Sequence, residues 1–236
     1  MKNFSLFLAL FLSFQFAQNI WGNSSVATSD DLSAFEFNPA GFAINHGDMT
    51  GFYIQPDESG KFSSDVTFYD AMISNGFGIM IGANKNTKLF RLKTYPMVKI
   101  GTGFKIYKDI NYGFSVDNKE NLKLGLLWRP HKMTSLGVTE SYTEFKNHYS
   151  TALGIAFRPL LTHRLTIGLD YKTFSDPNME AQLNPFIELH PVKGLKLSIS
   201  KSEINSEDNW NINLGFTFDS HSELYVSNQR NVDTDF

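Results

Sequence analysis

The sequence of 236 residues contains no cysteine. This absence excludes disulfides, thiolate metal sites and the lipid-modified cysteine that anchors lipoproteins. The chain also has no surplus of basic residues, because 21 Lys and Arg stand against 24 Asp and Glu, for a formal net charge of -3. Without a basic surplus there is no electrostatic field for a phosphate backbone. We therefore expect no nucleic acid among the partners.

Motifs of catalysis and cofactor binding are missing as well. The chain has no Gly-x-Ser-x-Gly elbow, no phosphate-binding loop and no zinc-protease helix motif. Its six His residues are scattered, and His46 and Asp48 have no further metal ligands nearby in the sequence. We expect no enzyme activity, no cofactor and no metal site.

Only the N-terminus carries a long apolar run. Residues 4–16 are mostly apolar and follow Lys2, which is the form of a secretory signal. The run is shorter than the ~20 residues that a membrane-spanning helix needs, which argues against the alternative of a membrane anchor. Cleavage after Ala27 satisfies the preference for small residues, and cleavage after Gly22 is the alternative. The sequence predicts a signal peptide over residues 1–27 and export from the cytoplasm.

No stretch beyond residue 46 keeps a helical periodicity. In residues 149–158, Leu153, Ile155 and Phe157 alternate with small or charged residues, and residues 164–174 repeat the pattern after a short turn. This period of two is typical of a β-hairpin with one apolar face. The pattern predicts about 12 strands, with a range of about 10–14. They lie at residues 47–55, 61–70, 74–83, 89–93, 98–107, 110–117, 122–129, 133–142, 149–158, 164–174, 181–190, 195–201, 209–219 and 223–228.

Alternation fits either a barrel or a sandwich of two sheets, and three further features favour the barrel. The strands approach the 9–11 residues that cross a bilayer at a tilt. Aromatic residues gather near strand ends, as in membrane-interface girdles. Glycines recur in the middle of strands, opposite the large apolar residues, where they relieve crowding and help a small barrel to curve. These are the glycines at positions 101, 113, 125, 154, 168 and 215.

The fold class that we predict is all-β: an antiparallel up-and-down transmembrane β-barrel over residues 47–229, followed by a polar tail at residues 230–236. A lipid-facing Lys or Arg near the bilayer midplane costs ~2–4 kcal/mol. The basic residues of the strands share the face opposite the apolar set, so they are candidates for lining a lumen. They either set the selectivity of a pore or pair across a blocked interior. The candidates are Lys99, Lys105, Lys123, Arg129, Arg158 and Arg164, together with Asp117 and Asp170.

The segment Asp-Asp-Leu-Ser-Ala-Phe-Glu-Phe-Asn-Pro-Ala-Gly-Phe-Ala at residues 30–43 resembles the opening of known barrels. These are outer-membrane barrels of the long-chain fatty-acid transporter and PorV-like group. Residues 153–160 and 164–171 also resemble barrel regions that precede peptidase domains in bacterial SppA-like proteins. The resemblance implies a plug-like segment at residues 28–46, with Asn38, Pro39, Ala40 and Gly41 at its bend. Compared with a fatty-acid transporter, we expect no long extracellular loops that could form a capture site. We also expect no protease activity, because the sequence shows no peptidase domain.

These observations predict an outer-membrane protein for the passage of a hydrophobic or small solute. The alternative is a non-conducting barrel that anchors or docks a periplasmic or secretion partner, and a soluble periplasmic β-sandwich is the third interpretation. The expected partners are outer-membrane lipid and either a hydrophobic small molecule or a protein.

Overall fold

A computed structural model describes residues 25–44, 48–55, 67–83, 97–143, 149–192, 195–204, 207–217 and 223–231. The predicted leader up to residue 24, His46 and the short strand predicted at residues 89–93 lie outside these described residues. In the described part, 13 strands form one sheet, and the order of strands along the sheet follows their order in the chain. The all-β, antiparallel, up-and-down arrangement expected from the alternation is thus confirmed.

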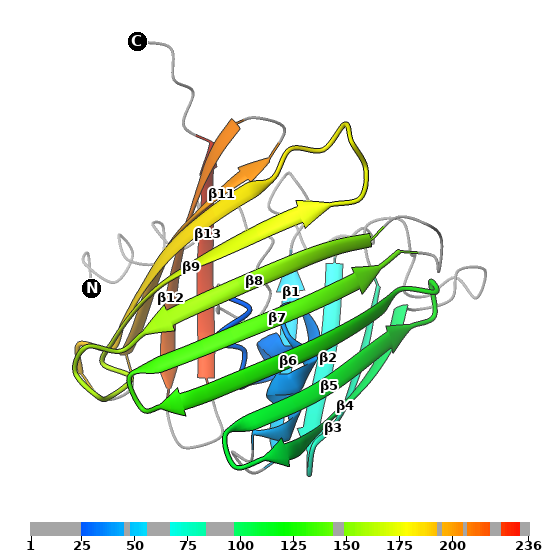
Figure 1. The fold of residues 1–236 in the computed structure, drawn as a ribbon, viewed down its shortest axis with the longest axis horizontal. Coiled ribbons are helices and arrows are strands. Elements are labelled where there is room, and N and C mark those ends of the chain that lie inside the picture. The colour runs from blue at the N-terminus through cyan, green and yellow to red at the C-terminus, as the bar shows by residue number, and fades with distance from the viewer. Residues whose placement is uncertain are drawn as a thin grey trace, which may run out of the picture.

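Strands that follow one another in the chain lie side by side in the sheet (Figure 1). Where two strands are adjacent in the sequence they pair antiparallel, and within the described residues no pairing joins β1 to β13. The strands are β1 (Met49–Gln55), β2 (Thr67–Ser74), β3 (Phe77–Ala83), β4 (Met97–Tyr107), β5 (Ile110–Asp117), β6 (Leu122–His131), β7 (Thr134–Tyr142), β8 (Tyr149–Phe157), β9 (Leu165–Phe174), β10 (Gln182–Leu189), β11 (Leu195–Ile204), β12 (Glu207–Thr217) and β13 (Glu223–Asn231).

The C-terminal boundary differs slightly from the prediction. Strand β13 extends to Asn231, because Arg230 and Asn231 still pair with Trp210 and Asn209 of β12. Residues 230 and 231, predicted to begin the polar tail, are thus part of β13, and the rest of the predicted tail lies outside the described residues.

The two faces of the sheet differ sharply. In β8, Leu153, Ile155 and Phe157 are 48%, 50% and 45% exposed, whereas Ala156 between the last two is 1% exposed. We call the face that carries the exposed apolar side chains the outer face and the opposite one the inner face. The outer face is not purely apolar, since Asp70 is exposed there opposite Phe52. A single sheet with an uncovered apolar face differs from a sandwich, in which two sheets bury such faces against each other.

The N-terminal segment, residues 25–44, lies against the inner face, and the sheet curls around it (Figure 1). It contains two short 3₁₀ helices, η1 (Leu32–Phe35) and η2 (Pro39–Ala43). Asp31 and Asn38 cap their N-termini, and Pro39 occupies the first turn of η2, where its missing N–H costs nothing. The caps hold the segment in a compact shape.

An apolar cluster joins the N-terminal segment to the first strands. Phe35 of η1 and Phe42 of η2 meet edge to face, with ring centroids 4.8 Å apart. Around them pack buried side chains of the same segment and of β2 and β3, namely Leu32, Ala34, Ala71, Ile73 and Met80. The hydrophobic core of the described protein thus lies inside the curve of the sheet rather than between two sheets.

Candidate functional site

Asn38 is a buried polar side chain between the N-terminal segment and the sheet. It is 0% exposed, and its Nδ2 donates to the carbonyl oxygens of Val26 at 2.9 Å and of Leu126 in β6 at 3.0 Å. Its Oδ1 accepts from Ala40 N at 3.0 Å. Asn38 therefore links the two ends of the segment and ties both to the sheet.

Asp170 of β9 holds the beginning of the N-terminal segment. Its Oδ1 accepts from Ser25 Oγ at 2.7 Å, and its Oδ2 accepts from Val26 N at 2.9 Å. Nearby, Ser135 Oγ of β7 donates to the carbonyl oxygen of Ala27 at 2.6 Å. A carboxylate that accepts two buried hydrogen bonds is a strong anchor. Residues 25–27, which the predicted cleavage after Ala27 assigns to the leader, are thus an integral part of the docked segment.

Three of the predicted lumen-lining cations bind the N-terminal segment. Arg129 Nη2 pairs with Asp30 Oδ2 at 2.9 Å. Lys99 Nζ donates to the carbonyl oxygen of Phe35 at 3.0 Å, and Lys123 Nζ donates to that of Glu36. The two lysines face backbone carbonyls at the C-terminal end of η1, where unsatisfied carbonyls attract cations.

The other predicted lumen residues are placed differently. Arg158 is buried at the end of β8, and Asp117 accepts hydrogen bonds from Lys119 N and Asn121 N in the β5–β6 turn. Lys105 and Arg164 are exposed near strand ends. Of the predicted turn motif, Asn38, Pro39, Ala40 and Gly41 are all buried at the start of η2.

The inner-face glycines lie where the N-terminal segment comes closest to the sheet. A Cβ added at Gly113 would lie 2.1 Å from the carbonyl oxygen of Pro39, and one at Gly125 would lie 2.1 Å from Asn38 Oδ1. Real Cβ atoms do not approach other atoms so closely. The glycines were predicted to ease crowding and curvature; in the structure Gly113 and Gly125 make room for a second backbone against the sheet, whereas a Cβ at Gly168 would meet the ring of Phe186 on the neighbouring strand.

A buried ionic cluster on β10 and β11 was not anticipated from the sequence. Glu188 Oε1 lies 3.5 Å from Lys196 Nζ and 3.1 Å from His190 Nε2. In the sequence, Glu188 and Lys196 alternate with the apolar outer-face residues of their strands. This alternation could have predicted that both point to the inner face.

The Asp31 carboxyl has an unusual acidity. Burial raises its pKa from 3.8 to about 6, against the lowering effect of Lys196 and with a smaller rise from Asp30. Because the pKa in the folded protein lies above the ordinary value, the protonated carboxyl adds to the free energy of unfolding. This contribution is fully present below pH 3.8. It is lost as the pH rises through about 6.

We expect Asp31→Asn to be increasingly more stable than the wild type as the pH rises. Asparagine keeps an oxygen for the hydrogen bond from Ser33 N, which is 2.8 Å long in the wild type, but it never ionises. The gap in the free energy of unfolding between the two proteins is expected to open from 3.8 to about 6 and then to stay constant. Denaturant titrations across this range measure the gap, and a gap that does not change with pH would contradict the assignment.

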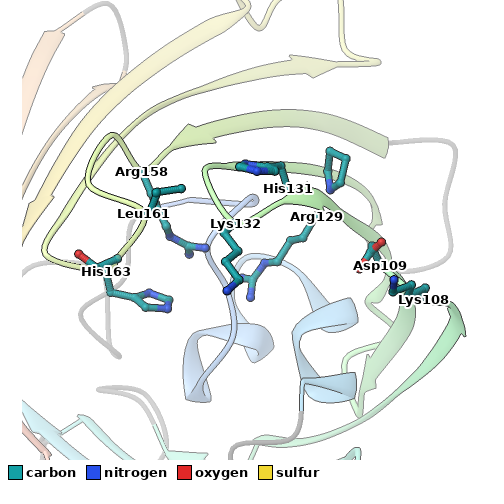
Figure 2. A pocket seen from close by; sticks show the side chains of 10 residues that line it. Lys108, Asp109, Arg129, His131, Lys132, Arg158, Leu161 and His163 are labelled. Carbon is teal, nitrogen blue, oxygen red and sulfur yellow. The ribbon is translucent and has the colours of Figure 1, made fainter.

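A cavity of about 540 Å³ opens at the end of the sheet that carries the β4–β5, β6–β7 and β8–β9 turns. We call this the short-turn end. The three turns supply Lys108 and Asp109, then Arg129 to Lys132, then Arg158 and residues 161–163. Figure 2 shows the cavity above the N-terminal segment. Desolvation, followed by the charge of Arg158, lowers the pKa of His163.

The described residues include no cluster of three or more His, Cys, Asp or Glu that could hold a metal ion. None of the helices in the described ranges has the length and apolar character needed to cross a membrane. Comparisons with family models, with curated proteins and with solved structures found no match to this chain.

Proposed function

We propose that this chain is an outer-membrane β-barrel for the passage of a hydrophobic or small solute. Its N-terminal segment plugs the lumen when no solute passes. The observation that supports this most is the contrast between the two faces of one sheet. The outer face presents a band of exposed large apolar residues, whereas the inner face is apolar at β2 and β3, carries many polar side chains from β5 onward and is occupied by the segment. Monomeric soluble proteins rarely expose an apolar surface of this extent.

The height of the outer band supports the membrane assignment. Tyr149 and Phe157 bound the band on β8, and the eight residue steps between them span ~27 Å along the strand. A tilt of 35–45° reduces this to about 20 Å, close to the ~25 Å apolar band of outer-membrane barrels. Exposed aromatic side chains lie toward both margins, with Tyr107, Trp128 and Phe157 at the short-turn end and Tyr149, Tyr171 and Trp210 toward the other. They match the aromatic girdles of such barrels.

Two of the turns at the short-turn end support an assignment of sidedness. Periplasmic turns of outer-membrane barrels are short. The β4–β5 and β6–β7 turns contain two residues each, 108–109 and 132–133. We therefore place the short-turn end toward the periplasm. Export to that membrane requires the N-terminal leader, and the burial of Ser25, Val26 and Ala27 favours its cleavage after Gly22 over cleavage after Ala27.

A second candidate is a non-conducting barrel that anchors a periplasmic or secretion partner. Three side chains, Asn38, Asp170 and Arg129, hold the N-terminal segment against the sheet at the same time. A gate has to leave the lumen for solute to pass, so such firm attachment favours the anchoring barrel. In this alternative the segment is a permanent stopper that rigidifies the barrel.

Liposomes separate these functions. The purified chain is folded into liposomes loaded with a small sugar and with a hydrophobic dye, and flotation and release are measured. Flotation with release of either solute supports passage, whereas flotation with sealed liposomes supports the anchoring barrel. A chain that stays in the aqueous phase without detergent would contradict the membrane assignment and with it both candidates.

A further inference from the structure

We propose that the cavity at the short-turn end binds a phosphate group. The inference does not depend on solute passage or on insertion into a membrane, because it rests on the side chains of three adjacent turns. It assigns to this end of the protein a ligand-binding site that is separate from the contacts of Asn38 and Asp170.

The cavity is lined mainly by cations. Lys108, Arg129, Lys132 and Arg158 contribute four positive charges, and Asp109 contributes one negative charge. Asp30 of the N-terminal segment offsets a further charge through its ion pair with Arg129. Two positive charges remain uncompensated among these six residues. The charge of a phosphate monoester near neutral pH is about −1.5 to −2, which matches this surplus.

Arg158 provides the most specific feature of the cavity. Its side chain is 7% exposed, and its Nε is buried without a hydrogen-bond partner among the described residues. A buried N–H group without a hydrogen-bond partner costs free energy, and such groups in native proteins call for a ligand or another explanation. A planar guanidinium suits the paired oxygens of a phosphate.

The cations converge on one space. In Figure 2 the side chains of Arg129, Lys132 and Arg158 extend toward the same region above the N-terminal segment, and Lys108 lies at the margin. Like charges held this close repel one another. Burial lowers the pKa of the Arg158 guanidinium; the carboxylates of Asp30 and Glu188 oppose this shift, and Arg129 adds to it. An anion bound between them relieves the repulsion.

The framework of the cavity is built before any ligand arrives. Arg129 N donates to the carbonyl oxygen of Asp109 at 2.9 Å, which joins the first turn to the second. Arg158 N donates to the carbonyl oxygen of Met133 at 2.7 Å, which joins the second turn to the third. The cavity volume of about 540 Å³ lies within the ~300–1,000 Å³ of typical small-molecule sites. There is therefore room for an organic group beside the phosphate.

The phosphate has two chemical sources, a free phosphate ester and the headgroup of a phospholipid. Isothermal titration calorimetry on the full chain, folded in detergent micelles at constant ionic strength, uses inorganic phosphate and dihexanoyl phosphatidic acid as the two probes. Saturable binding of both probes supports a free phosphate ester as ligand. Saturable binding of the lipid alone supports a headgroup.

Substitution of the cavity residues decides whether the binding belongs to this site. Arg158→Gln is expected to weaken binding about tenfold or more, because it removes a charge-assisted contact. Lys119→Gln is the matched control, since Lys119 is an exposed cation in the β5–β6 turn at the opposite end of the sheet. It is expected to bind as the wild type does.

A second variant covers the case in which Arg158→Gln does not fold. Lys108 and Lys132 line the cavity and are both exposed, so the double variant Lys108→Gln/Lys132→Gln leaves the packing intact. It is also expected to lose affinity by about tenfold. The proposal is overturned if neither probe binds saturably to the wild type, or if the folded cavity variants bind as tightly as Lys119→Gln.

Discussion

Replacing Asn38 with alanine is expected to weaken the docking of the N-terminal segment by about 3 kcal/mol or more, because buried polar groups left without partners cost about 1–3 kcal/mol each. The substitution removes three hydrogen bonds at once, to the carbonyl oxygens of Val26 and Leu126 and from Ala40 N. The amide is 0% exposed, so water cannot replace it without entering the core.

Amide hydrogen exchange measures this loss at Val26, whose N–H donates to Asp170 rather than to Asn38. A change of this size accelerates exchange about a hundredfold. Amides of β8 serve as an internal reference, because the hairpins do not depend on Asn38. Asn178→Ala is the matched control, since the Asn178 side chain is exposed and donates only to Asp176. Equal exchange in the two variants would show that Asn38 does not hold the segment.

Gly113→Ala is expected to displace the N-terminal segment while leaving the strands in place. The new Cβ would lie 2.1 Å from the carbonyl oxygen and 2.4 Å from the carbonyl carbon of Pro39. Both atoms belong to the backbone, so no side-chain rotation relieves the overlap. Overpacking typically costs about 1–3 kcal/mol and occasionally more, and a rigid backbone contact places this case near 3 kcal/mol.

The expected readout of Gly113→Ala is faster exchange of the N-terminal amides together with faster release of a small sugar from liposomes. Ser115→Ala is the control on the same strand and face, because it keeps a Cβ and removes only a hydroxyl for which the described residues offer no hydrogen-bond partner. Faster exchange without faster release would favour the anchoring barrel over passage. A segment that stays protected in Gly113→Ala would contradict the close approach at Gly113.

Alternation of apolar residues was enough to locate most of the strands. Residues 149–158 and 164–174 were predicted as strands, and the structure has β8 and β9 at Tyr149–Phe157 and Leu165–Phe174. This works because one face is apolar and the other is small or polar, so a shift by one residue would invert every side chain. The conformation of a tight turn also depends on only a few neighbouring residues. Asn75 and Gly76 have positive φ angles of 50° and 81°, which suit a tight hairpin.

Contacts of the N-terminal segment could not be predicted in the same way. The sequence indicates that Lys99 and Lys123 share a face with glycines, but their partners are carbonyl oxygens of residues 35 and 36. Backbone acceptors leave no trace in the pattern of side chains. Asp170 was likewise assigned to a lumen, whereas its partners Ser25 and Val26 lie more than 140 residues away and were assigned to the leader.

The number of strands determines how the first and last strands could pair if the sheet closes into a barrel. Directions alternate from strand to strand, so with 13 described strands the first and the last run the same way. If β1 and β13 meet, they must join as parallel neighbours, whose slanted hydrogen bonds are slightly less stable per residue than those of antiparallel pairs. In the proposed barrel that junction would be the weakest seam of the circumference, and lateral opening is expected to begin there.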